Sequence, residues 1–167
     1  MTSTQHTCTI DSPVGPLELV AVDGALTEIH FAGTAPATQG DLDSDPVLRE
    51  AVDQLTAYFG GVRTEFDLPL DGRGSEFQKR VWQALTEVPY GETWSYAQLA
   101  RHIGSPTASR AVGAANGQNP LPVVVPCHRV VGTNGTLVGY GGGLDRKRVL
   151  LELEAKVRLN RDFGATL

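Results

Sequence analysis

The side chains most able to carry out chemistry stand together in the second half of the chain, in the sequence Pro126-Cys127-His128-Arg129. A cysteine thiolate is a strong nucleophile, and a neighbouring imidazole or guanidinium can stabilise it. Burial has the opposite effect, because it raises the pKa of a thiol above its usual value of about 8.5. A single cysteine beside an apolar run is also, more often than not, an inert core residue. Cys127 alone therefore leaves both interpretations open.

His128 could act as the base that removes the thiol proton, provided that a carboxylate orients its second ring nitrogen. Three candidate carboxylates follow along the chain, namely Asp145, Glu152 and Glu154. The helical pattern after Asp145 places Glu154 on the apolar stripe, where an unpaired carboxylate would be costly. The sequence therefore predicts a relay of Cys127, His128 and Glu154. Neighbouring residues of an extended chain face opposite sides, so Cys127 and His128 can exchange a proton only through a bridging water or where the chain bends locally.

Helices are expected on both sides of this stretch. Two short ones are joined by Gly104-Ser105, which gives the outline of a helix-turn-helix. The expected helices run from Ser75 to about Tyr90, from Tyr96 to Ile103, from Pro106 to Asn116, and from about Asp145 to Val157 with Val149, Leu150 and Leu153 inward. The run from Val123 to Val125, with Val130-Val131 beyond, is β-branched and of buried character.

The second helix of the helix-turn-helix has unusually small side chains between Ala108 and Asn116, with one long exception, Arg110. A helix that reads the major groove normally presents several long polar side chains to the base edges. Small residues instead permit close approach to the narrow minor groove, where Arg110 could enter the base stack. The alternative is that alanine and glycine simply allow tight helix packing.

Residues 1–72 have a different character. Apolar runs separated by turn signals such as Asp23-Gly24 predict a small antiparallel sheet, followed by a helix and a last short strand. The expected strands are Cys8 to Ile10, Leu17 to Val22, Leu26 to Phe31 and Glu65 to Leu70, and the helix is Pro46 to Phe59. With a boundary at residues 71–74, the prediction is an α/β (α+β) chain with an N-terminal α/β domain, residues 1–72, and a mostly helical C-terminal domain, residues 73–167.

Charge is divided unevenly along the 167 residues, although the formal net charge is only −5. Residues 1–72 hold two basic and twelve acidic side chains, residues 73–148 hold nine basic and four acidic, and the remainder is neutral. The segment that contains Cys127 therefore carries a net charge of +5, although the protein as a whole is acidic. Such asymmetry is typical of a chain whose basic part binds a polyanion.

The two cysteines are 119 positions apart, and the first ten residues have no positive or apolar stretch of a secretory signal. No apolar run approaches the ~18 residues of a membrane span. We therefore expect a cytoplasmic protein that does not contact membranes. His6, His30 and His102 lack cysteines or carboxylates at metal-binding spacing, so no metal site is expected.

Several distinctive motifs occur together in residues 75–155: they are Ser95-Tyr96, Ser109-Arg110-Ala111-Val112-Gly113, Asn119-Pro120, Pro126-Cys127-His128-Arg129-Val130-Val131-Gly132 and the glycine loop from Tyr140 to Leu144. In this combination they closely resemble the O6-alkylguanine-DNA alkyltransferases, also called methylated-DNA-protein-cysteine methyltransferases. The resemblance extends more loosely to the turn from Ile10 to Gly15. It implies a ribonuclease-H-like N-terminal domain and a C-terminal helix-turn-helix.

The resemblance implies direct DNA repair without a cofactor. The alkyl group of O6-alkylguanine, or of O4-alkylthymine, would pass irreversibly to the Cys127 thiolate, so that each molecule acts once. His128 resembles a water-bridged base and Glu154 its buried partner. Tyr96 resembles the phenol that donates to guanine N3, and Asn119 the hinge that holds the active-site turn against the DNA-binding helix.

The same resemblance implies that the partner is double-stranded DNA, bound through the minor groove with the damaged base flipped out, and that the protein is a monomer. Arg110 resembles the side chain that fills the gap left by the flipped base. The other implied DNA contacts are Ser95, Tyr96, Ala108, Ala111, Gly113, Asn116 and Arg129. The implied substrate pocket is formed by Pro122, Val130, Tyr140, Gly141 and Gly142, with the carbonyls of Cys127 and Val130 accepting from the exocyclic amine.

Two departures from the family pattern are visible. Gly141 stands where some relatives present a serine hydroxyl to O6, and Cys8 does not align with the zinc ligands of relatives that bind zinc. Two rival functions remain at this point. One is a damage-binding protein without chemistry, which would lack the reactive cysteine, and the other is a cysteine hydrolase that turns over repeatedly.

Overall fold

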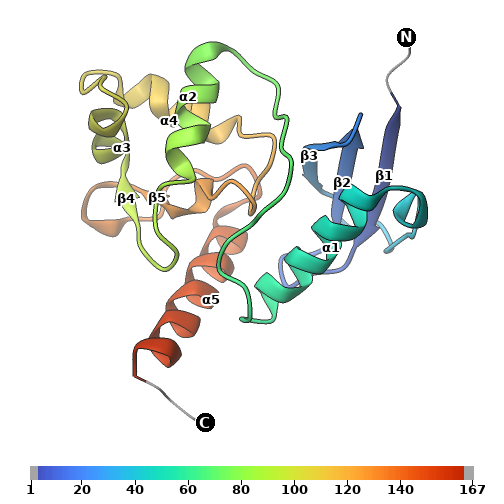
Figure 1. The fold of residues 1–167 in the computed structure, drawn as a ribbon. Helices are drawn as coiled ribbons and strands as arrows, with labels where there is room; N and C mark the ends of the chain where they lie inside the picture. The colour runs from blue at the N-terminus through green and yellow to red at the C-terminus, as the bar shows by residue number, and fades with distance from the viewer. Residues whose placement is uncertain (1–3, 164–167) are drawn as a thin grey trace. The chain divides into compact units, whose positions relative to one another are not determined.

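The computed structural model describes residues 4–163. The chain forms two compact units, divided between Arg73 and Gly74 (Figure 1). Within residues 4–163, none of the helices combines the length and the apolar character needed to cross a bilayer. All residues expected to carry chemistry lie in the second unit.

The first unit contains the expected antiparallel sheet, with strand order β1-β2-β3. Its strands are β1 (Gln5–Ile10), β2 (Leu17–Val22) and β3 (Ala25–Phe31). The predicted turn at Asp23-Gly24 connects β2 and β3, and both residues adopt positive φ angles, 49° and 82°. Leu17 and Leu19 of β2 are fully buried, which gives the sheet one apolar face.

Helix α1 (Pro46–Phe59) covers this sheet, and its limits are those predicted from the apolar spacing (Figure 1). Leu48, Ala51 and Leu55 form its buried face. Asp45 caps the helix by accepting hydrogen bonds from the backbone N–H groups of Val47 and Leu48, and a short 3-10 helix, η1 (Leu42–Ser44), precedes it.

The prediction of a strand from Glu65 to Leu70 is wrong. In this segment the structure has only an isolated bridge between Leu26 and Leu70. The side-chain amide of Gln54 explains the difference. It accepts from Asp67 N at 2.8 Å and donates to Asp67 O at 2.9 Å, so both backbone groups of Asp67 are bonded to a helix side chain. Pro69, which has no N–H, weakens the strand further.

The second unit begins with α2 (Glu76–Leu85), α3 (Tyr96–His102) and α4 (Ser109–Gly117). Ser75 and Ser95 cap α2 and α3, each in a reciprocal capping box with a glutamine three residues later. The predicted helix-turn-helix is therefore α3 and α4, although α2 ends and α4 begins a few residues away from the limits expected. The Trp82 indole donates to the Ala115 carbonyl at 2.8 Å and fixes α2 against α4.

The remaining elements form around the Cys127 segment. A 3-10 turn, η2 (Cys127–Arg129), leads into β5 (Val130–Val131), which pairs in parallel with β4 (Trp94–Ser95). A second 3-10 turn, η3 (Thr133–Gly135), opens the loop that leads to α5 (Leu144–Asp162). The valines from 123 to 125 are buried, as expected, but they lie in a turn.

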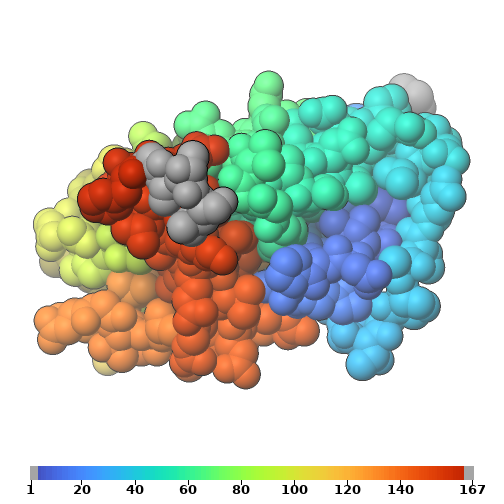
Figure 2. All heavy atoms as spheres, turned by 90° about the horizontal axis from the view of Figure 1, so that it is seen from below, coloured from blue at the N-terminus to red at the C-terminus, as the bar shows by residue number. Residues whose placement is uncertain are grey.

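Helix α5 is longer than predicted, and its inward face differs from the prediction. Val149 is exposed at 36%, Leu153 is half-buried, and the buried face consists of Lys147, Leu150 and Glu154. Lys147 therefore faces inward on α5, whereas Val149, which was expected to face inward, is exposed. Beyond Glu154 the helix becomes exposed, with Leu159 and Phe163 on the surface; the red atoms of Figure 2 show this end of the chain.

Candidate active site

Cys127 begins a tight turn rather than lying in an extended strand. It stands at the start of η2, and the preceding loop includes Val123 in the left-handed conformation, φ 73°. Asn119 holds that loop by donating to Val125 O at 2.8 Å and accepting from Leu121 N at 3.0 Å. The η2 turn bends the chain between Cys127 and His128, but no hydrogen bond to His128 Nδ1 is present within residues 4–163. The thiol is nearly covered, with Cys127 exposed at 5%.

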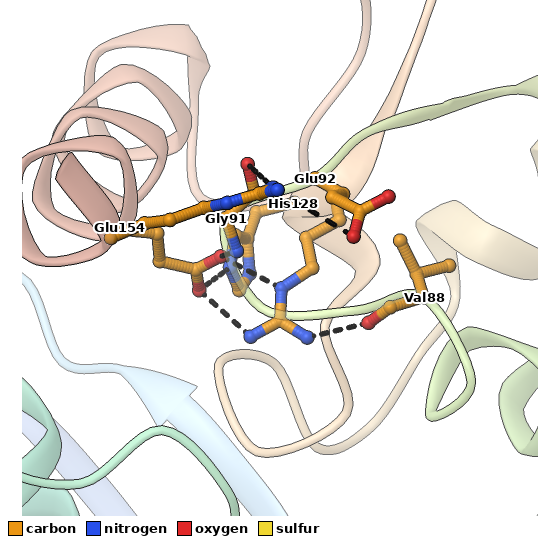
Figure 3. Close-up of polar contacts among 7 residues, drawn as sticks. Val88, Gly91, Glu92, His128 and Glu154 are labelled. Atoms are coloured by element: carbon orange, nitrogen blue, oxygen red, sulfur yellow. Dashed lines mark hydrogen bonds and ion pairs between the residues drawn. The ribbon is translucent and has the colours of Figure 1, made fainter. Parts of the chain in front are cut away.

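His128 and Glu154 are hydrogen-bonded, as the helix pattern predicted. His128 Nε2 lies 2.7 Å from Glu154 Oε2, and both side chains are fully buried (Figure 3). Because a carboxylate can only accept, Nε2 carries the proton in the neutral imidazole and Nδ1 is the unprotonated nitrogen. Nδ1 is buried and has no hydrogen-bond partner among residues 4–163. The structure therefore leaves one basic nitrogen available beside the cysteine turn.

Arg129 shares the Glu154 carboxylate instead of pointing outward. Its Nε and Nη2 donate to the two carboxylate oxygens at 2.8 and 3.0 Å, and Nη1 donates to Val88 O at 2.8 Å (Figure 3). The guanidinium also lies over the Tyr90 ring at 5.4 Å. This placement, with Arg129 exposed at only 6%, argues against the DNA contact expected from the sequence and indicates a positioning role.

Glu154 also fixes the turn that precedes β4. Its Oε1 accepts from Gly91 N at 3.2 Å, while Arg158, one helical turn further along α5, reaches Gly91 O at 3.4 Å. Gly91 has φ 77°, and a Cβ atom there would lie 2.7 Å from the Arg158 side chain, so glycine is required at this position. One carboxylate thus connects the cysteine turn to the segment that leads into α3.

Burial and charge set the protonation states of these groups. Burial lowers the pKa of His128, against the opposing effect of Glu154. Burial alone would raise the pKa of Glu154, but hydrogen bonds and charges from His128 and Arg129 outweigh it and hold this pKa at about 2. Burial raises the pKa of the Cys127 thiol to about 11, with Asn119 and Lys147 acting in the other direction. The resting site therefore combines a protonated thiol, a neutral imidazole and an ionised carboxylate.

Tyr96 begins α3 and points toward Val138, which lies two residues before the glycine loop. Its hydroxyl donates to Val138 O at 3.2 Å. Burial raises the pKa of Tyr96, with the neighbouring Cys127 acting in the same direction and an Asn116 hydrogen bond opposing it. The phenol is therefore protonated and stands near the thiol. A phenolic proton at this position could be given to a substrate that replaces Val138 O.

The residues expected to contact DNA fall into two groups. Arg110 and Ala111 are exposed in the first turn of α4, and Ala108 occupies the position before the helix. Gly113 faces the Tyr96 ring, and the Ser95 hydroxyl caps α3. Asn116, like Arg129, faces the interior: it is exposed at 4% and donates to Cys127 O at 3.4 Å, which argues against the expected DNA contact.

The residues expected to form the pocket come from both sides of the cysteine turn. Pro122, Val130 and Gly142 are buried, Tyr140 is half-buried, and Gly141 is exposed. Burial strongly raises the pKa of Tyr140, and Cys127 contributes in the same direction. The carbonyls of Cys127 and Val130 already accept hydrogen bonds, from Asn116 and Lys147 respectively.

Lys147 was not identified from the sequence, although it is fully buried next to these groups. Its ammonium donates to the carbonyls of Val130, Val138 and Gly139 at 2.6, 3.0 and 3.1 Å. The sequence pattern could have revealed its burial, because Lys147 lies three residues before Leu150 and seven before Glu154, on the same helical stripe.

Among residues 4–163, no group of three or more His, Cys, Asp or Glu side chains is placed to hold a metal.

The chain matches two family models. The model described as 6-O-methylguanine DNA methyltransferase, ribonuclease-like domain, matches residues 6–72, and the model described as 6-O-methylguanine DNA methyltransferase, DNA binding domain, matches residues 76–156. The chain belongs to the 6-O-methylguanine DNA methyltransferase family. The two matches also identify the sheet-containing unit as ribonuclease-like and the helical unit as a DNA-binding domain.

Relatives within the methyltransferase family are similar over nearly the whole chain. The methylated-DNA–protein-cysteine methyltransferase of Mycolicibacterium paratuberculosis is 54% identical over 150 residues, which cover 89% of this chain and 91% of the relative. The crystal structure of Mycobacterium tuberculosis O6-methylguanine methyltransferase has a TM-score of 0.80 and 50% identity, covering 92% and 94% of the two chains. A crystal structure of the M. tuberculosis protein in complex with DNA has a TM-score of 0.78 and 52% identity, covering 89% and 92%.

Proposed function

We propose that this protein repairs DNA by transferring the alkyl group of O6-alkylguanine from duplex DNA to its own Cys127, once per molecule. O4-alkylthymine is the second substrate of the proposal, and the protein acts as a monomer in the cytoplasm. The observation that carries it is the buried Cys127 turn, fixed by His128, Arg129 and Glu154 within a domain of the methyltransferase family.

The first step is removal of the thiol proton. Nδ1 of His128 is the available base, and Glu154 stabilises the imidazolium that forms. Because burial opposes ionisation of Cys127, a thiolate forms only together with this proton transfer, through a water bridge or after a small movement of the turn. This arrangement keeps the nucleophile inactive toward small electrophiles until a substrate fills the site.

The second step is transfer of the alkyl group. The Cys127 sulfur attacks the alkyl carbon, the bond between that carbon and O6 breaks, and the electron pair remains on guanine. Tyr96 donates its proton to guanine N3, so that the base leaves uncharged, and the proton that His128 took from Cys127 then restores the neutral phenol. The thioether that remains on Cys127 is stable, and no group in the site is able to hydrolyse it, so the protein is consumed.

Access to the base requires it to leave the duplex, because O6 cannot reach a protein thiol inside the stack. The exposed Arg110 at the start of α4 is suited to occupy the gap, and the small residues beside it permit close approach to the minor groove. The basic segment, residues 73–148, supplies attraction to phosphates without reading sequence. A repair protein needs this, since it must accept damage in any sequence context.

The test is to incubate the protein with duplex DNA that contains one O6-methylguanine and to examine both products. We expect one methyl group on the peptide that contains Cys127, none on the Cys8 peptide, and an equal amount of restored guanine. Cys127→Ser should bind the lesion and transfer nothing. Unmodified protein with intact lesion would refute the proposal, and repeated product release without a modified peptide would indicate a hydrolase.

A further inference from the structure

Asn116 on α4 is a buried polar side chain that has no role in the steps above. It is exposed at 4%, and its Nδ2 group donates to Cys127 O at 3.4 Å. Because a carbonyl can only accept, this bond fixes the orientation of the amide, with the nitrogen toward the cysteine turn and Oδ1 facing away from it. Oδ1 is buried and has no hydrogen-bond partner within residues 4–163. A buried acceptor of this kind is costly unless a ligand or a water molecule donates to it.

The surroundings of Asn116 include the phenol of Tyr96 as well as the cysteine turn. Gly113 lies one helical turn before Asn116 on the same face of α4, and a Cβ atom at Gly113 would lie 3.7 Å from the Tyr96 ring. The ring therefore packs on the face of α4 that carries Asn116. Burial and the neighbouring Cys127 raise the pKa of Tyr96, and a hydrogen bond from Asn116 opposes them. Asn116 thus contacts both the backbone of the nucleophile and the phenol.

An acceptor at this point selects a base that has a hydrogen-bond donor. A guanine that carries an alkyl group on O6 has lost its N1 proton, so the exocyclic 2-amino group holds the only N–H groups of the base. In the proposed function Tyr96 donates to N3, and the carbon that carries the amino group is bonded directly to N3. A guanine whose N3 meets the Tyr96 hydroxyl therefore directs its amino group toward the polar groups beside that hydroxyl.

We propose that Asn116 Oδ1 accepts a hydrogen bond from the 2-amino group of the extruded O6-alkylguanine and so contributes to the choice of guanine as the repaired base. This inference rests on the proposed function. The contact is made with the extruded base inside the second unit, because Asn116 is buried and does not face the groove of the duplex. The base of O4-alkylthymine has no N–H group, so Asn116 favours O6-alkylguanine over this second substrate.

The other acceptors of the site already have partners or a different task. Val130 O accepts from Lys147 at 2.6 Å, and Cys127 O accepts from Asn116 itself. His128 Nδ1 is the base that removes the thiol proton in the proposed function. When Oδ1 bonds to the amino group, Nδ2 can keep its bond to Cys127 O, so both ends of the amide are satisfied only with the base in place.

The first experiment compares two duplexes that differ only in the 2-amino group, one containing O6-methylguanine and the other O6-methylhypoxanthine. Single-turnover rates of methyl transfer to Cys127 are measured for the parent protein and for Asn116→Leu, which keeps the approximate size of the side chain but cannot accept. The parent should prefer O6-methylguanine, and Asn116→Leu should reduce this preference about tenfold. The matched control is Gln118→Leu, which replaces an exposed amide just after α4 and should leave the preference unchanged.

The ratio of the two rates separates recognition of the base from a structural role. If Asn116 only positions Cys127 and Tyr96, Asn116→Leu slows transfer from both duplexes equally, and such an unchanged preference overturns the proposal. Asn116→Ala repeats the comparison if Asn116→Leu does not fold. A parent protein that takes no methyl group from O6-methylguanine would refute the proposed function instead.

The second experiment measures binding and so does not depend on the rate of transfer. The affinity of Cys127→Ser for each duplex is determined by fluorescence anisotropy, with and without Asn116→Leu in the same chain. Cys127→Ser should bind the O6-methylguanine duplex more tightly than the O6-methylhypoxanthine duplex, and Asn116→Leu should remove most of this difference. A difference of the same size in both proteins overturns the proposal.

Discussion

Replacing Glu154 with glutamine tests how much of the stability of the second unit depends on one carboxylate. The pKa of Glu154 is about 2 in the folded protein, against an ordinary value of 4.5. At about 1.4 kcal/mol per pKa unit, this difference corresponds to about 3 kcal/mol of stability at neutral pH. Glutamine has no charge and cannot accept all the hydrogen bonds from His128, Arg129 and Gly91. We therefore expect Glu154→Gln to lower the free energy of unfolding at pH 7 by about 3 kcal/mol.

The effect has a defined pH dependence. Because the pKa of Glu154 is depressed on folding, its contribution is complete above about pH 5 and is lost as the pH falls toward 2. More than half of it should be gone by about pH 3. The unfolding free energies of the parent protein and of Glu154→Gln should therefore converge as the pH is lowered over this range.

The assay is urea unfolding followed by tryptophan fluorescence. Both tryptophans, Trp82 and Trp94, lie in the second unit, so the signal does not report on the first. Glu152→Gln is the matched control, since Glu152 is exposed on the same helix and should change little. Equal stability of Glu154→Gln and the parent at pH 7, or parallel pH curves, would refute this account of the site.

Three further substitutions test other parts of the structure. Arg110→Ala should slow alkyl transfer from duplex DNA much more than transfer from free O6-benzylguanine, and equal losses with both substrates would contradict a role in base flipping. Tyr96→Phe should keep the fold by circular dichroism but reduce the rate of transfer about 100-fold, and an unchanged rate would exclude the phenol as proton donor. Asp45→Ala removes the cap of α1 and should lower the free energy of unfolding by roughly 1 kcal/mol, which would be measured as faster amide hydrogen exchange in that helix. Asp43→Ala is the control, and equal protection of the amides in the two variants would argue against the cap.

Local patterns in the sequence were sufficient for most of the fold. The three strands and α1 could be predicted because alternating apolar residues, turns such as Asp23-Gly24 and the spacing after Pro46 act over a few residues. The prediction of a strand near Asp67 failed because the deciding interaction is not local. Its backbone groups are bonded to Gln54, thirteen residues away, and no local pattern reports a side chain that competes with a strand.

In the candidate site, too, some features could be predicted from local patterns and others could not. The pairing of His128 with Glu154 could be predicted, because an acidic residue on an apolar helical stripe requires a buried partner. The internal partners of Arg129 and Asn116 could not be predicted, because the sequence around each residue does not reveal that its hydrogen-bond partner lies inside the unit. Lys147 was missed because a lysine in a charged helix is normally solvated, and its acceptors, Val130 and Val138, come from segments that only the fold brings to it.

The different surroundings of Gly91 and Gly141 determine which of the two glycines can be replaced without disturbing the packing of the second unit. A side chain at Gly91 would collide with Arg158 and would require a strained backbone conformation, in the turn whose N–H group donates to Glu154. Gly141 is exposed, and a Cβ atom at this position would meet only Gly117 O, at an ordinary contact distance of 3.8 Å. Gly141 therefore has room for a side chain, and a substitution there would leave the hydrogen bonds around Glu154 intact.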